Sequence, residues 1–211
     1  MIVKICGITT LDDGLAAVEA GADMLGFNFY PPSPRYVERE ACAAMITGLR
    51  ARGVQATMVG VFVNQPAAEV AAILDECGLD LAQLSGDEPP EDLALLGERA
   101  FKALRPRDVV AAASLAAIYP RRAASPALLV DASAGAGRFG GAGQTGDWAA
   151  ARALAAQRPI LLAGGLRPEN IAAAVAAVQP WGVDVASGVE SSPGRKDPAK
   201  MQAFVRAAHG R

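Results

Sequence analysis

The chain of 211 residues has a single histidine, His209, and only three cysteines, Cys6, Cys42 and Cys77. The cysteines are too few and too scattered for a disulfide framework, and their spacing is not that of zinc ligands. We therefore expect neither a zinc site nor acid–base catalysis by histidine. If the protein is an enzyme, carboxylates and thiols are the groups that must move its protons.

Long basic runs and long apolar runs are also missing. The formal net charge is -2 and no run of five or more Lys or Arg residues occurs, so no field attracts nucleic acid or an acidic membrane. The apolar stretches are far shorter than a membrane span, and no signal-peptide pattern is visible. We expect no nucleic-acid or membrane partner and a cytoplasmic location, where free thiols persist.

Short apolar segments alternate with alanine-rich helical segments along the chain. The expected strands cover 2–6, 23–29, 57–63, 81–84, 101–104, 127–131, 160–163 and 183–186; the expected helices cover 11–20, 38–51, 66–77, 90–98, 106–118, 168–178 and 197–208, with one more beginning at Asp147. Such alternation indicates a parallel sheet with helical crossovers, and an open doubly wound sheet more often uses fewer strands. We predict an α/β protein with one (β/α)8 TIM barrel domain spanning 1–211.

In such a barrel, chemistry takes place at the carboxyl ends of the strands and in the loops that follow them. The residues with functional side chains or glycine turns at those positions are Cys6, Asn28, Arg35, Asn64, Gln83, Asp131, Gly164, Gly165, Ser187 and Gly188.

Cys6 and Asp131 are the candidate proton-transfer groups. Cys6 ends the first strand, where a cation such as Lys4 would favour the reactive thiolate. Lys4 could equally be a structural charge of the barrel floor, and Cys6 a small buried hydrophobe. Asp131 follows four apolar residues, and partial burial favours the neutral, proton-donating form of a carboxyl group. Its alternative role is in a cap or a turn.

The loops after the seventh and eighth strands predict a phosphate site. Gly164-Gly165 and Ser187-Gly188 let backbone N–H groups approach an anion without obstruction by Cβ atoms. Barrels often hold phosphate between these two loops, although the glycines could serve only the tight turns. Arg35 lies in a proline-rich loop, where its guanidinium could bind a carboxylate in bidentate fashion or remain at the surface.

Motifs in a fixed order extend along nearly the whole chain. They are Lys4-Ile5-Cys6-Gly7-Ile8-Thr9, Gly26-Phe27-Asn28-Phe29, Ser33-Pro34-Arg35, Val59-Gly60-Val61-Phe62-Val63-Asn64, Gln83-Leu84, Gly86-Asp87-Glu88, Asp131 with Gly140-Gly141-Ala142-Gly143 and Asp147-Trp148, Ala163-Gly164-Gly165-Leu166, Pro168-Glu169-Asn170, Val183-Asp184-Val185, and Ser187-Gly188-Val189-Glu190 with Gly194 and Lys196-Asp197. In this order they resemble the phosphoribosylanthranilate isomerase family, whose fold is a (β/α)8 barrel.

The resemblance implies an Amadori rearrangement in tryptophan biosynthesis. N-(5-phospho-β-D-ribosyl)anthranilate would become 1-(2-carboxyphenylamino)-1-deoxy-D-ribulose 5-phosphate. It implies Cys6 as the general base, Asp131 as the general acid and Arg35 near the anthranilate carboxylate, with the phosphate on the seventh and eighth loops. No cofactor or metal is implied; the partner would be this small phosphorylated substrate, and the protein a monomer or homodimer.

Three positions depart from the pattern of that family. Ser85 stands where histidine is usual, Ala142 where threonine or serine is usual, and Gly146 where phenylalanine is usual. These changes concern loop rigidity and the packing of the anthranilate ring, not the acid or the base.

Two alternatives keep the barrel and change the function. A barrel like indole-glycerol-phosphate synthase would need lysine and glutamate at its strand ends, and no lysine ends the expected strands 2 to 4. A non-catalytic binder of a phosphorylated ligand is the other alternative, and the joint presence of Cys6 and Asp131 argues against it.

Overall fold

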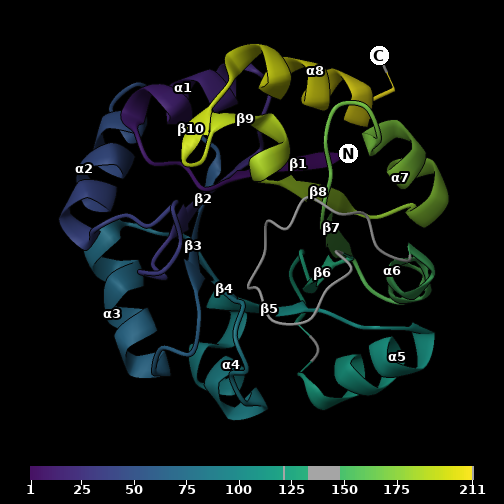
Figure 1. The fold of residues 1–211 in the computed structure, drawn as a ribbon. Helices are drawn as coiled ribbons and strands as arrows, with labels where there is room; N and C mark the ends of the chain where they lie inside the picture. Colours follow the sequence, from purple (N-terminus) through teal and green to yellow (C-terminus); the bar gives the residue numbers. More distant parts are fainter. Residues whose placement is uncertain (121, 133–147, 211) are drawn as a thin grey trace.

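The computed structural model describes residues 1–120, 122–132 and 148–210, which form a closed barrel of eight parallel strands ringed by eight α-helices (Figure 1). The barrel strands are β1 (Ile2–Cys6), β2 (Met24–Asn28), β3 (Thr57–Phe62), β4 (Leu81–Leu84), β5 (Ala100–Leu104), β6 (Leu128–Asp131), β7 (Ile160–Ala163) and β8 (Gly182–Val185). The helices are α1 (Leu11–Glu19), α2 (Arg39–Arg50), α3 (Ala67–Cys77), α4 (Pro90–Leu96), α5 (Val109–Ile118), α6 (Trp148–Ala155), α7 (Ile171–Val178) and α8 (Pro198–Ala208), with a 3₁₀ turn η1 (Gly97–Arg99) after α4. The parallel pairing of β1 with β8 closes the ring, which confirms the predicted (β/α)8 fold.

Two helices begin three residues later than the sequence predicted, each for a local reason. The carboxylate of Asp108 accepts a hydrogen bond of 2.7 Å from the third residue of α5, so the helix starts after this cap and not at 106. Before α7, the side chain of Asn170 donates to the carbonyl of Gly165 at 3.0 Å and ties residues 168–170 to the preceding loop as a turn. The expected helix start at Asp147 lies outside the described residues.

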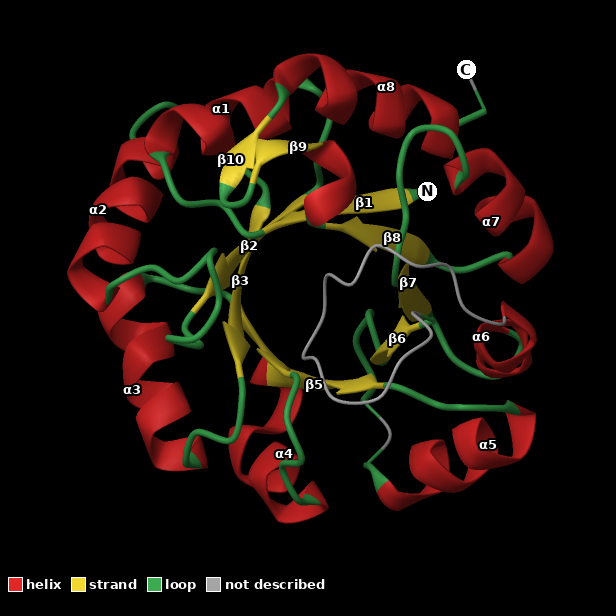
Figure 2. Ribbon diagram, viewed as in Figure 1, coloured by secondary structure: helices red, strands yellow, loops and turns green. Residues whose placement is uncertain are grey.

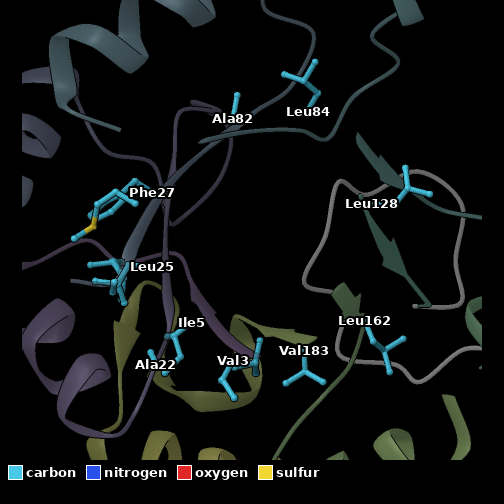
Figure 3. Close-up of a cluster of buried hydrophobic side chains, with 14 of the residues drawn as sticks. Val3, Ile5, Ala22, Leu25, Phe27, Ala82, Leu84, Leu128, Leu162 and Val183 are labelled. Atoms are coloured by element: carbon cyan, nitrogen blue, oxygen red, sulfur yellow. The ribbon is translucent and has the colours of Figure 1, made fainter. Parts of the chain in front are cut away.

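Alternate residues of each strand face the helices or the barrel interior. The outward residues pack with the helices in one large apolar cluster, part of which is drawn in Figure 3. The inward residues form a smaller cluster of Met24, Val59, Phe101, Ala103, Leu129, Leu161 and Ala163. Because Phe101 and Leu161 are fully buried there, this part of the interior is packed core and not a pore.

The loop after β8 contains structure that the sequence did not predict. It forms a 3₁₀ turn, η2 (Ser187–Val189), and then a small antiparallel sheet of β9 (Glu190–Ser192) and β10 (Arg195–Lys196), seen beside α1 in Figure 2. The hydroxyl of Thr9 donates to the carbonyl of Gly194 at 2.6 Å. A Cβ at Gly194 would lie 2.7 Å from the carbonyl oxygen of Pro34. The β9–β10 hairpin therefore joins the loops that follow β1 and β2.

None of the described helices is long and apolar enough to cross a membrane.

Candidate active site

A solvent-open cavity of about 830 Å³ lies at the carboxyl ends of the barrel strands. The predicted site residues that line it are Cys6, Arg35, Asp131, Gly164, Gly165 and Ser187, and Asn28 and Gln83 also line it. This is the end of the barrel at which (β/α)8 enzymes carry their active sites. The fold thus brings side chains that are far apart in the sequence to one cavity.

Gly188 is not among the residues that line this cavity. Its backbone approaches the loop after β7 so closely that a Cβ would overlap the carbonyl oxygen of Leu166. Gly188 therefore lets the loops after β7 and β8 pack against each other. In the first of these loops Gly164 and Gly165 have φ values of +101° and +63°, which favour glycine.

Cys6 is buried at the end of β1, and Lys4 lies on the same face of the strand. The ammonium of Lys4 donates to Asp184 Oδ1 at 2.7 Å, and the Lys4 side chain is fully buried. Burial disfavours the ammonium, but Asp184 and then the sulfur of Cys6 favour it, so the net result is a raised pKa of Lys4. The sequence left two roles open for Lys4; in the structure it forms an ion pair with Asp184 and interacts electrostatically with Cys6.

Arg35 is paired with a carboxylate of the protein. Its Nε and Nη2 donate to Glu190 Oε1 and Oε2 at 2.7 and 2.8 Å, and the ammonium of Lys196 donates to Glu190 Oε1 at 2.9 Å. Burial opposes ionisation of Glu190, but the hydrogen bond from Arg35 and the charge of Lys196 outweigh it, so the pKa of Glu190 is lowered. Arg35 and Lys196 also interact electrostatically with Cys6. Three positive side chains, those of Lys4, Arg35 and Lys196, therefore interact with the sulfur of Cys6.

Two glycines leave room for Cys6 and Arg35. Gly26 of β2 is the register partner of Cys6, and a Cβ on it would lie 2.8 Å from the Cys6 sulfur. Gly7 has a φ of +80°, and a Cβ there would overlap the side chain of Arg35. Neither glycine was predicted to have a role from the sequence, yet the parallel register alone would have placed Gly26 beside the thiol.

Asp131 is buried at the end of β6, beside Ala163 of β7. It faces the interior, as does Leu129 two residues earlier. β1 and β6 lie apart around the barrel (Figure 1), so Cys6 and Asp131 reach the shared cavity from different sides.

A buried ion pair supports the loops after β3 and β4. The ammonium of Lys102 lies 2.6 Å from Glu88 Oε2, and Glu88 Oε1 accepts from the backbone N–H groups of Asn64 and Gly86 at 2.8 and 2.9 Å. Burial opposes ionisation of Glu88, but the hydrogen bond and charge of Lys102 outweigh it and lower its pKa. Asn64 was a strand-end candidate in the sequence. Its backbone N–H binds the Glu88–Lys102 ion pair, and Asn64 does not line the cavity.

Several charged residues that line or adjoin the cavity were given no role from the sequence: Arg105, Asp184, Glu190 and Lys196. Arg105 could have been found by the rule that selected Asp131, because it follows β5 directly. Glu190 and Lys196 gave no such signal, since the β9–β10 hairpin that positions them was not predicted. The departures at Ala142 and Gly146 lie outside the described residues. No group of three or more potential metal-ligating His, Cys, Asp or Glu side chains occurs among the described residues.

Comparison with known proteins identifies relatives over the full length of the chain. The model of the family described as N-(5′-phosphoribosyl)anthranilate (PRA) isomerase matches residues 3–207. A protein of Geobacter sulfurreducens named N-(5′-phosphoribosyl)anthranilate isomerase is 49% identical over 208 residues, which are 99% of this chain and 98% of that protein.

Solved structures of isomerases with the same name are similar to this chain over its full length. Phosphoribosyl anthranilate isomerase from Thermotoga maritima superimposes with a TM-score of 0.87 at 34% identity, covering 100% of both chains. A structure of monomers derived from that enzyme, which is described as dimeric, gives a TM-score of 0.83 at 33% identity over 100% of both chains. A phosphoribosyl anthranilate isomerase in complex with reduced 1-(o-carboxyphenylamino)-1-deoxyribulose 5-phosphate gives 0.84 at 34% identity, again over 100% of both chains.

The family model and a relative of nearly one-half identity both span almost the whole chain, and the barrel superimposes on solved members. The chain therefore belongs to the N-(5′-phosphoribosyl)anthranilate isomerase family.

Proposed function

We propose that Cys6 and Asp131 are the general base and general acid by which this isomerase acts. The reaction converts N-(5-phospho-β-D-ribosyl)anthranilate to 1-(2-carboxyphenylamino)-1-deoxy-D-ribulose 5-phosphate, a step of tryptophan biosynthesis. The observation that carries the assignment is that both side chains line one cavity with the glycine loop after β7 and Ser187 after β8. A thiol and a carboxyl group on different sides of a substrate can each move one proton.

Ring opening is the first step. Asp131, which is buried at the end of β6, donates a proton to the ring oxygen while the lone pair of the aniline nitrogen forms a double bond to C1. The C1–O bond breaks, and an iminium ion with a free hydroxyl at C4 results.

Proton abstraction follows. The iminium ion acidifies the hydrogen on C2, and the thiolate of Cys6 removes it, which gives an enolamine. The enolamine takes a proton at C1 and the C2 hydroxyl loses one, so the product is a ketone with the same atoms as the substrate. Lys4, Arg35 and Lys196 interact with the sulfur, and neighbouring cations are what a cysteine that acts as a base requires.

The two anionic ends of the substrate need separate partners. The loops after β7 and β8 supply backbone N–H groups near Gly164, Gly165, Ser187 and Gly188 for the phosphate, with Gly188 acting through the packing of the loops. Arg35 lines the cavity and contributes a guanidinium contact to the carboxylate end. The complex of a solved relative with a reduced form of the product supports a small phosphorylated substrate of this class.

The assembly and location of the protein follow as further parts of this proposal. The protein is a monomer or a homodimer, as the description of the Thermotoga maritima enzyme illustrates for a relative. It acts in the cytoplasm, where Cys6, Cys42 and Cys77 remain free thiols, as they are in the structure.

The activity is tested by following the fluorescence of phosphoribosylanthranilate, formed from anthranilate and ribose 5-phosphate, after the purified protein is added. We expect the fluorescence to decay faster than in the protein-free control, with one equivalent of the ketose phosphate formed. A decay equal to that of the control would refute the function, and binding of the reduced product without turnover would favour the non-catalytic alternative.

A further inference from the structure

Two of the cysteines meet between α2 and α3, away from the active-site cavity. Cys42 lies in the first turn of α2, and Cys77 is the last residue of α3. The two helices are neighbours that pack against each other on the outside of the barrel (Figure 1). Neither residue lines the cavity that contains Cys6. The pair is therefore separate from the thiol of the proposed mechanism.

The sulfur of Cys77 lies against the first turn of α2. The thiol of Cys77 donates a hydrogen bond of 3.4 Å to the carbonyl of Arg39, the first residue of α2. The side chains of Cys42 and Cys77 are also hydrogen-bonded to each other. Two sulfur atoms in such contact are within a small movement of the separation that a disulfide needs, whereas most cysteines on different helices would require a movement of the backbone.

One thiol of the pair can be reached from solvent. Cys42 has no exposed surface and Cys77 is 3% exposed, but Cys77 lines an open groove between α2 and α3 that Cys42 does not line. A small oxidant that enters the groove therefore meets Cys77 first. An accessible thiol beside a second, protected thiol is the arrangement in which oxidation ends in a disulfide.

The surroundings of the pair keep it reduced until an oxidant is present. Burial raises the pKa of both thiols. At Cys77 the hydrogen bond with Cys42 and the charge of Arg39 oppose this increase, whereas the charges of Glu76 and Glu40 add to it, and the net pKa is raised. Both thiols are therefore protonated at neutral pH and react more slowly than an exposed cysteine. All three cysteines are free in the structure.

We propose that Cys42 and Cys77 form a redox-modification site at which hydrogen peroxide converts the two thiols to a disulfide that joins α2 to α3. The sulfur of Cys77 gives up its proton and attacks one peroxide oxygen, the O–O bond breaks, and water leaves a sulfenic acid on Cys77. The sulfur of Cys42 then displaces this hydroxyl group, which leaves as water with the Cys42 proton. Two thiols lose two electrons, and one peroxide is reduced to two molecules of water.

The disulfide would hold three consecutive elements together. β3 lies between α2 and α3 in the chain, so the bond would close a loop that contains this strand. Such a cross-link restricts the unfolded chain. Because the two sulfur atoms already lie together in the folded protein, we expect the oxidised protein to unfold at a temperature higher by roughly 5–15 °C.

The test counts thiols after oxidation of the full chain in a Cys6→Ser background, where the thiol of Cys6 cannot react. The protein is treated with hydrogen peroxide, denatured and alkylated with N-ethylmaleimide, and its mass and peptides are measured. We expect the two thiols to be lost together, with a decrease of about 2 Da for the two hydrogen atoms removed. A peptide pair joined through Cys42 and Cys77 should appear, and dithiothreitol should restore both thiols.

Matched variants in the same background separate the two roles. In Cys42→Ala oxidation should stop at a sulfenic acid on Cys77 that dimedone traps, and in Cys77→Ala the thiol of Cys42 should stay reduced because it does not line the groove. The inference is wrong if both thiols survive overnight treatment with excess peroxide, if Cys77 proceeds to sulfinic acid although Cys42 is present, or if the disulfide lowers Tm. None of these results depends on isomerase turnover, so they are independent of the proposed function.

Discussion

The position of the Cys6 sulfur depends on the absence of a side chain at Gly26. The two residues are partners in the β1–β2 ladder, both on the inward face, and a Cβ on Gly26 would also lie 3.0 Å from the Cys6 Cα atom. Such a contact with backbone cannot be relieved by a side-chain rotation alone. Gly26 is therefore part of what positions the proposed base, without touching the substrate itself.

Gly26→Ala should displace the sulfur and lower kcat by about 10- to 100-fold, since small misplacements of a reacting group cost that much. The measurement is steady-state turnover of phosphoribosylanthranilate by variants shown to be folded by circular dichroism. Gly48→Ala is the matched control: it lies in α2, where the added Cβ would lie 3.2 Å from the methyl ends of Leu11 and 3.7 Å from Arg52 Nη1, the ends of two side chains and not backbone. A folded Gly26→Ala enzyme with the kcat of the wild type would contradict the positioning role.

Some residues of the site could be predicted from the sequence, and some contacts between them could not. Cys6 and Asp131 could be selected because each ends an apolar strand, and strand direction then determines the end of the barrel at which they lie. The ion pair of Arg35 with Glu190 could not be predicted in this way, because the two residues are 155 positions apart. Their contact depends on the β9–β10 hairpin, which is too short to leave a pattern in the sequence.

At the scale of elements, the loops after β3 and β4 are held by the buried pair of Glu88 and Lys102. Besides Glu88, the ammonium of Lys102 binds the carbonyl of Gly86 at 2.6 Å, and the hydroxyl of Tyr119 donates to the carbonyl of Glu88 at 3.1 Å. One carboxylate thus ties two loops and two neighbouring strands together on the β4–β5 side of the cavity.

Glu88→Gln should destabilise the protein by about 3–5 kcal/mol, because it leaves the buried ammonium of Lys102 without its counter-charge. Chemical denaturation at pH 7 measures this free energy of unfolding. Glu91→Gln, at an exposed position in α4, should change it by no more than about 0.5 kcal/mol. Equal effects of the two substitutions would show that the Glu88–Lys102 ion pair contributes nothing to the free energy of unfolding.

The same pair predicts how stability depends on pH. The pKa of Glu88 is lower in the folded state than its ordinary value, so the folded protein binds this proton more weakly than the unfolded chain. Its contribution is therefore complete above an ordinary carboxyl pKa of about 4.3 and is lost as the pH falls through the lowered value. Unfolding curves between pH 7 and pH 3 should show a smaller acid-dependent loss in Glu88→Gln than in the wild type.

At the scale of the whole molecule, the barrel was predictable and the detail of its loops was not. Strands at 2–6, 81–84 and 160–163 were located to the residue because a strand covered on both faces is short and mostly apolar. Helix starts near 106 and 168 were misplaced because the Asp108 side chain, which accepts a hydrogen bond, and the Asn170 side chain, which donates one, hold the residues before the first helical turn. The place of Cys6 and Asp131 at one end of the barrel followed from its topology. The charged side chains around them could not be predicted, because they are positioned by contacts between distant loops.

The proposed mechanism requires that a thiol on β1 and a carboxyl group on β6 act as base and acid in one cavity. Its most direct test is the kcat of Cys6→Ser and Asp131→Asn beside Cys42→Ala, a control at a buried thiol in α2. We predict that Cys6→Ser and Asp131→Asn each lose roughly 10²–10⁴-fold in kcat, the range for removing a general acid or base, while Cys42→Ala turns over like the wild type. Near wild-type turnover by either Cys6→Ser or Asp131→Asn would contradict the claim.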